Sequence, residues 1–236
     1  VEHMKALYDG EIAQADSYLE RILNHAKKSG LDKNTIFIFM SEHGDLFGEH
    51  GRFMRGGPLR GTFYNPVLNF PLLIKHPALD QEIRVSSLAQ TVDLLPTLLD
   101  MLDRNDPHKD RRQGKSLIPV ITGRGAVNEY VYAASKYKAD ASNMFFKGVS
   151  VVEAIADREW KLIRERIYDI ATKEKTTDSY EFYNISNDPK EETNLYKREA
   201  KRAEELNTKL KEWVNKFKLD DGQEAQLPQD GRTMPR

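Results

Sequence analysis

A short apolar run that stops at an acidic residue and a histidine constrains this chain more than any other stretch. Residues Ile36–Met40 are all large and apolar, and the run is too short for a typical helix. It ends at Ser41–Gly44, where Glu42 and His43 are adjacent and a glycine follows. The run predicts a strand that is buried on both faces, as in a parallel sheet covered by helices. The Glu42–His43 pair then lies at a strand end, where open α/β sheets bind ligands.

An acidic-His-Gly tripeptide also fits a purely structural role, in which His43 bonds a backbone carbonyl and Gly44 turns the chain. The surrounding residues favour chemistry instead. The pattern recurs at Gly48–Gly51, and three arginines follow in a glycine-rich stretch: Arg52, Arg55 and Arg60. Guanidinium groups and exposed backbone N–H groups suit a tetrahedral oxyanion. The stretch therefore predicts metal or anion chemistry.

Composition excludes several classes of function. The chain has 236 residues, of which 39% are hydrophobic, so it can bury a core for one large or two small domains. A net charge of -1 gives no reason to expect nucleic-acid or membrane-surface binding, and no apolar run is long enough to span a membrane. Val1–Met4 shows no sign of a signal peptide. The absence of cysteine excludes disulfides, thiolate metal sites and cysteine nucleophiles, and leaves the compartment open.

The first part of the chain is typical of an α/β domain. Apolar residues recur at three- and four-residue steps from Met4 to Lys28, which predicts an amphipathic helix that ends at Gly30. A second short buried strand is expected at Pro71–Pro77. A further helix is expected after Asp93, which we interpret as its N-terminal cap. We place the end of this domain at residue 124.

The second part predicts an antiparallel sheet packed by one helix. Strands are expected at residues 129–134, 150–156, 160–165 and 181–185, with a hairpin turn at 157–159 and a charged loop at 172–179. An apolar face between Leu195 and Phe217 predicts the last helix. We therefore expect an α+β subdomain over residues 125–219, followed by a loose tail over 220–236.

Four motifs, in the same order, resemble the sulfatases of the alkaline phosphatase superfamily. That family typically carries Ser-Asp-His-Gly, Gly-Glu-His-Gly, Lys-Gly-Thr-x-Tyr and then Val-Pro-Leu-Ile. This chain has Ser41–Gly44, Gly48–Gly51, Arg60–Tyr64 and Phe70–Ile74 in the corresponding places. Later segments match as well: Val92–Asp100, Gly114–Pro119 and Phe182–Leu195. The resemblance implies the end of an alkaline-phosphatase-like α/β sheet domain followed by the small α+β subdomain, and it covers only the second half of a sulfatase.

The resemblance also implies roles for individual residues. Glu42 takes the position of the family's metal-binding Asp, and His43 that of the adjacent Asn or His ligand. Arg60 stands where the family has a Lys that contacts a sulfate oxygen, with Arg55 as the alternative cation. His50 fits either substrate contact or the ordering of its loop. Two residues depart from the family pattern. Glu42 is one methylene longer than the family's Asp, and Arg60 is not equivalent to the family's Lys.

The family's nucleophile is a formylglycine made from Cys or Ser within Cys/Ser-x-Pro/Ala-x-Arg, and this chain has neither a cysteine nor that motif. We therefore expect a C-terminal fragment, because the chain starts inside a helical pattern with no strand before it; a relic without catalysis is the alternative. The missing N-terminal half would carry the formylglycine and act as a partner. The expected cofactor is a divalent cation, calcium before magnesium or manganese, and the expected substrate is a sulfated small molecule or glycan. The chain alone should be inactive and bind calcium weakly.

Three functions remain open on the sequence. The leading one is hydrolysis of sulfate esters. A second is a phosphodiesterase or phosphonate monoester hydrolase of the same superfamily, which shares the Asp-His-Gly pattern. The third is a non-catalytic module that binds an anion or a partner through the arginine- and glycine-rich loop. An upstream reading frame without the formylglycine motif would favour the third.

Overall fold

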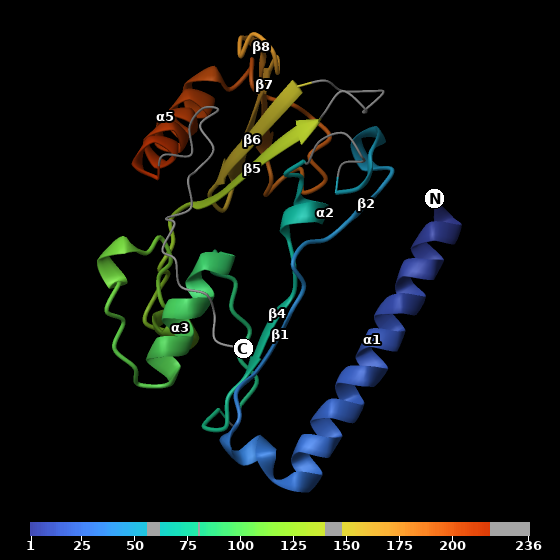
Figure 1. Cartoon of the computed structure of the whole chain (residues 1–236), viewed down its shortest axis with the longest axis vertical. Coiled ribbons are helices and arrows are strands. Elements are labelled where there is room, and N and C mark those ends of the chain that lie inside the picture. Colours follow the sequence, from blue (N-terminus) through green and yellow to red (C-terminus); the bar gives the residue numbers. More distant parts are fainter. Residues whose placement is uncertain (56–61, 80, 140–147, 218–236) are drawn as a thin grey trace.

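The computed structural model describes residues 1–55, 62–79, 81–139 and 148–217, and Figure 1 shows how the elements are arranged. The chain begins with the expected long helix, α1 (Glu2–Ser29), which ends at Gly30 with a φ of 75°. This left-handed conformation is the usual helix end at glycine. Within α1 the side chain of Ala26 is buried, whereas Leu7 is 60% exposed and Ile22 58% exposed. The predicted apolar stripe of α1 therefore exists, but the described residues leave most of it uncovered.

The predicted strand after this helix forms, and its partner among the described residues runs antiparallel to it rather than parallel. A short 3₁₀ turn, η1 (Leu31–Asn34), leads into β1 (Phe37–Met40), which pairs antiparallel with β4 (Leu72–Lys75). Phe39 is 39% exposed and Leu73 58% exposed, so the pair is not buried on both faces by described residues. An apolar run indicates burial and a strand, but it carries no information on the direction of the partner strand.

Between these two strands lie a small hairpin and a single helical turn. The hairpin consists of β2 (Leu46–Phe47), the 3₁₀ turn η2 (Glu49–Gly51) and β3 (Phe53–Met54). The helical turn, α2 (Asn65–Leu68), has proline in its first turn, where the missing N–H has no helical partner to lose. The hairpin carries His50, and the helical turn contacts Gly44 through Val67.

Asp93 occupies the predicted N-cap position of α3 (Leu94–Met101), but its side chain is fully buried and forms its bonds elsewhere. It lies at the junction of η3 (Thr91–Asp93) and α3, and its side chain does not cap α3. The carboxylate instead accepts hydrogen bonds from the Gln90 amide at 2.9 Å, the Lys115 amide at 2.8 Å and Asn128 Nδ2 at 2.7 Å. Asp93 thereby ties α3 to the segment that leads through η4 (Lys109–Arg111) to α4 (Ile118–Ile121).

The second part of the chain is, as expected, an antiparallel sheet, and its four strands lie in the order β5-β6-β7-β8. Its strands run longer than the sequence indicates: β5 (Val131–Ala139), β6 (Gly148–Ala156), β7 (Trp160–Tyr168) and β8 (Lys175–Asn184). The turn at 157–159 closes with a bond from the Asp157 amide to the Trp160 carbonyl at 3.0 Å. The expected loop at 172–179 is wrong from Lys175 onward, because pairing with β7 outweighs the low strand propensity of this charged segment.

The two faces of this sheet bury different partners. One face packs on α5 (Ala200–Lys216) through Ile155, Leu162 and Phe182, and Figure 1 shows α5 lying across the sheet. The neighbouring positions point to the opposite face and pack on the hairpin and α2. This second cluster contains Leu46, Phe63, Tyr64, Val67, Val152, Ala154, Ile163 and Tyr183. The alternation follows the two-residue period of a strand, and it gives the sheet an enclosed core on both sides.

The core on the second face joins residues from both sides of position 124. The boundary at 124–125 stays a prediction, and the tail at 220–236 lies outside the described residues. Within the described ranges, no helix is both long enough and apolar enough to cross a membrane.

Candidate functional site

The predicted acidic-His pair lies directly after β1. The Glu42 side chain is 86% exposed and that of His43 is 26% exposed, and Glu42 Oε1 lies 3.2 Å from His43 Nε2. The other ring nitrogen, Nδ1, lies 2.9 Å from the Gly44 carbonyl oxygen. The carbonyl can only accept, so Nδ1 carries the hydrogen and Nε2 is the nitrogen that faces the carboxylate. The structural and the functional interpretation of His43 therefore coexist, because its backbone contact leaves Nε2 directed at Glu42.

Gly44 fixes this strand end against α2. Its amide donates to the Val67 carbonyl at 2.9 Å. A Cβ at this position would lie 2.0 Å from the Pro66 carbonyl oxygen, so no residue with a side chain fits without movement of the backbone. The position of Glu42 and His43 therefore depends on the position of α2.

His50 leans on the residue that precedes the same helical turn. Its φ is 55°, which is uncommon for a residue with a side chain, and its ring stacks on that of Tyr64 at a centroid distance of 3.6 Å and an interplanar angle of 5°. A partly buried imidazole held flat on a tyrosine has a fixed orientation. Both roles expected for His50, loop ordering and substrate contact, are compatible with this placement.

Tyr64 is itself anchored to the four-stranded sheet. Its hydroxyl donates to Glu181 Oε2 at 2.7 Å, and the Tyr183 hydroxyl donates to the same oxygen at 2.7 Å. Burial raises the pKa of both tyrosines, and the hydrogen bonds to Glu181 raise it further, while the positive charge of Arg52 partly offsets this for Tyr64. Both tyrosines are therefore neutral donors at physiological pH. Nothing in the sequence pattern singled out Glu181, since the contact spans 117 positions.

The structure describes only one of the two arginines that are expected to bind the anion. Arg60 lies outside the described residues. Arg55, the alternative, is exposed, and its carbonyl accepts the Thr62 amide at 3.2 Å. The structure thus brings His50 and the Glu42–His43 strand end into contact with one short segment, residues 64–67. The position of Arg60 relative to them is not described.

Glu42 and His43 fit a metal site only in part. They offer one carboxylate and one imidazole, both of which are donor types for divalent cations. Calcium takes about six to eight oxygen ligands. No group of three or more His, Cys, Asp or Glu side chains within the described ranges could hold a metal ion. The pair can therefore contribute to a cation site whose further ligands come from elsewhere, and it does not form one alone.

Comparisons with known proteins agree with the motif pattern. The family model described as N-sulphoglucosamine sulphohydrolase, C-terminal, matches residues 48–220. The N-acetylglucosamine-6-O-sulfatase of Bacteroides thetaiotaomicron is 28% identical over 227 residues, which cover 93% of this chain and 37% of that protein. The solved structure of BT4656 in complex with its substrate D-glucosamine-2-N,6-O-disulfate is 27% identical, with a TM-score of 0.64, and the match covers 87% of this chain and 39% of that one.

The fold is also shared more widely. The phosphonate monoester hydrolase from Silicibacter pomeroyi superposes with a TM-score of 0.57 at 19% identity, over 86% of this chain and 38% of that one. At this identity the similarity concerns the fold alone. In each of these matches the chain spans well under half the length of the related protein.

Proposed function

Because the chain belongs to the N-sulphoglucosamine sulphohydrolase C-terminal family, we propose that it is the C-terminal part of a hydrolase of sulfate esters. The observation that carries this proposal is the convergence of two separate motifs on one segment. Gly44, which follows the acidic-His pair, bonds Val67, and His50 stacks on Tyr64. A site that binds one small anion needs such convergence.

Each candidate residue has a role in this proposal. Cleavage of a sulfate ester places charge on the non-bridging and leaving oxygens, so the reaction needs fixed positive charge around a tetrahedral group. Arg60 would bind a sulfate oxygen through its guanidinium, and His50, held flat by Tyr64, would orient the anion from the side. Glu42 and His43 would contribute one oxygen and one nitrogen ligand to a divalent cation.

Sulfatases generally use a divalent cation, and calcium is our proposal for this chain, with magnesium or manganese as alternatives. When bound, such an ion polarises the ester and lowers the pKa of the nucleophile. The remaining ligands and the formylglycine nucleophile would come from the part of a full-length sulfatase that this chain does not span.

The proposed substrate is a sulfated small molecule or glycan. The relatives support this class, since BT4656 was solved with a disulfated glucosamine and the B. thetaiotaomicron relative is named for a sulfated sugar. A phosphonate monoester hydrolase or phosphodiesterase is the second candidate, because those enzymes share the Asp-His-Gly pattern that Ser41–Gly44 resembles.

The proposal is tested by aryl sulfate hydrolysis in the longer protein that carries this chain. We expect turnover, and we expect Arg60→Ala to lower kcat by about 10²–10³-fold, the usual effect of removing one group that stabilises transition-state charge. Arg84→Ala is the matched control, because this arginine pairs with Glu82 in an exposed segment and its side chain is 91% exposed. Equal losses in the two variants, or no turnover by the wild-type protein, would contradict the proposal.

A further inference from the structure

A buried lysine of the sheet, Lys161, bonds the segment that the candidate site contacts, residues 63–67. Lys161 of β7 is 1% exposed. Its Nζ donates to the Phe63 carbonyl at 2.9 Å and to Asn65 Oδ1 at 2.7 Å, and it forms an ion pair with Glu191. A lysine ammonium has three N–H donors and no acceptor, so these three oxygens engage all of them. The full bonding capacity of Lys161 is thus directed at the residues around Tyr64 and at Glu191.

Glu191 bonds both Lys161 and the same segment around Tyr64. It is 1% exposed, and its Oε2 accepts the Asn65 amide at 2.6 Å while Oε1 faces Lys161. Its φ is 59°, a left-handed conformation that is disfavoured for a residue with a side chain. Asn65 Nδ2 also donates to the Pro189 carbonyl at 3.3 Å. Backbone strain of this kind persists where surrounding contacts hold the residue in place. The bonds of Glu191 to Asn65 and Lys161 do so here.

Stability alone does not explain a buried ion pair at this place. Removing two charges from water is costly, and apolar residues of similar volume often replace such pairs without loss of stability. Burial lowers the pKa of Lys161, and the negative charge of Glu191 acts in the opposite direction. Apolar side chains could not supply the directional bonds to Phe63 and Asn65, which fix a backbone position.

The residues that Lys161 and Glu191 bond, Phe63 and Asn65, adjoin the two contacts of the candidate site. Tyr64, which carries the His50 ring, precedes Asn65 by one position, and Val67, which bonds Gly44, follows it by two. We propose that Lys161 and Glu191 are positioning residues: their buried ion pair fixes residues 63–67, and these set the places of His50 and of the Glu42–His43 strand end. The catalytic consequence rests on the proposed function, whereas the geometric part does not.

The geometric part is tested on this chain by NMR. The stacked Tyr64 ring should shift the His50 ring protons upfield, and the Gly44 amide should be protected from hydrogen exchange through its bond to Val67. We expect Lys161→Met/Glu191→Gln to lose both signatures at both sites, although neither His50 nor Gly44 is substituted. Glu191→Gln alone has one acceptor oxygen where Glu191 uses two, and it leaves the buried Lys161 charge without its counter-charge, so it should weaken both signatures as well.

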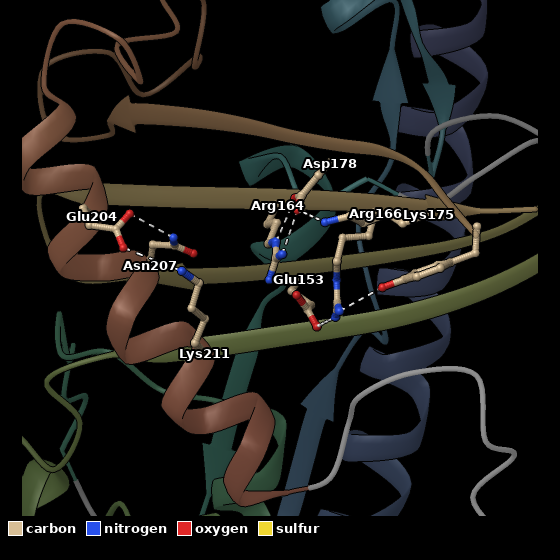
Figure 2. A network of polar contacts seen from close by, with 9 residues as sticks. Glu153, Arg164, Arg166, Lys175, Asp178, Glu204, Asn207 and Lys211 are labelled. Carbon is tan, nitrogen blue, oxygen red and sulfur yellow. Dashed lines mark hydrogen bonds and ion pairs between the residues drawn. The ribbon is translucent and has the colours of Figure 1, made fainter. Parts of the chain in front are cut away.

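The matched control is another ion pair of the same sheet. Nη2 of Arg164 in β7 lies 2.9 Å from Oδ2 of Asp178 in β8, and Figure 2 shows this pair in its network of polar contacts. Their described hydrogen bonds and ion pairs do not involve residues 62–67. Arg164→Gln/Asp178→Asn should therefore leave the His50 and Gly44 signals unchanged. If the Lys161/Glu191 variant also keeps them while it remains folded, the proposal is overturned.

Activity of the longer protein tests the consequence for catalysis. There, Lys161→Met/Glu191→Gln should lower kcat/KM for an aryl sulfate by about 10- to 100-fold, the usual cost of losing a group that orients site residues. The loss should appear under conditions where the fraction folded equals that of the wild type. Absence of wild-type turnover would contradict the proposed function, whereas normal turnover in a folded double variant would contradict the positioning role.

Discussion

The four-stranded sheet and the β1–β4 pair belong to one chain, but described residues enclose the two regions to very different extents. In the sheet, Ile155, Leu162 and Phe182 are each fully buried against α5, and the opposite face is covered by the hairpin and α2. In the β1–β4 pair, Leu73 is 58% exposed. The sheet region therefore contains its own core, whereas the strands that lead to the acidic-His pair gain much less from burial.

This difference separates stability from function within the chain. The sheet can serve as a rigid base, and it reaches the candidate site through the side chains of Lys161, Glu181 and Glu191. The acidic-His pair lies on the less enclosed region and is joined to that base by the contact between Gly44 and Val67. Precise placement of a weakly packed strand end thus depends on a well-packed neighbour.

The largest expected contrast comes from removing one ring in each region. Phe182→Ala should lower the free energy of unfolding by about 3–5 kcal/mol, because Phe182 is fully buried and stacks on Trp160 at 4.9 Å. Phe39→Ala in β1, where the side chain is 39% exposed, should cost about 1 kcal/mol or less. Urea denaturation measures both. Similar losses would show that β1 is as well enclosed as the sheet.

Two glycine-to-alanine substitutions should change the free energy of unfolding by smaller amounts and in opposite directions. Gly44→Ala should destabilise the chain by about 1–3 kcal/mol, because the added Cβ would overlap the Pro66 carbonyl. Gly10→Ala in α1 should stabilise it by about 0.5–1 kcal/mol, since nothing lies within 4 Å of the added carbon and alanine favours a helix. Thermal unfolding resolves the two. A neutral Gly44→Ala would mean that the strand end is not fixed on α2.

The smallest effect should come from a polar pair on the sheet (Figure 2), and it should depend on pH. Hydrogen bonds from Arg164 hold the pKa of Asp178 well below its usual range. The pair therefore stabilises the fold above the unfolded-state pKa of about 3.9, and this contribution is lost as the pH falls below it. Asp178→Asn should cost about 1 kcal/mol or less at pH 7, because solvent screens a partly exposed pair. The difference from wild type should shrink below about pH 4, and a difference that grows there would contradict this assignment.

The sequence predicted most elements because their signals are local. The period of α1, its glycine end and the turn at 157–159 each depend on residues close together in the chain. The sequence did not show the antiparallel direction of the β1–β4 pair or the strand that begins at Lys175, because both depend on a partner strand rather than on their own composition.

The candidate site divides in the same way. Glu42, His43 and His50 could be named from short motifs, and their roles stay predictions. The contacts that hold them could not be named, because Lys161 and Phe63 are 98 positions apart and Asn65 and Glu191 are 126 apart. Glu191 lies within the segment Phe182–Leu195 that resembles the family, but its bond to Asn65 depends on the folded chain.

The central claim, that this chain serves sulfate ester hydrolysis, is tested most directly by the selectivity of the longer protein that carries it. The measurement is kcat/KM for an aryl sulfate against that for the matching aryl phosphodiester, made on one preparation with calcium present. We predict that the sulfate ester is the better substrate and that Lys161→Met/Glu191→Gln lowers its turnover. A preference for the phosphodiester would contradict the claim and favour the phosphodiesterase alternative.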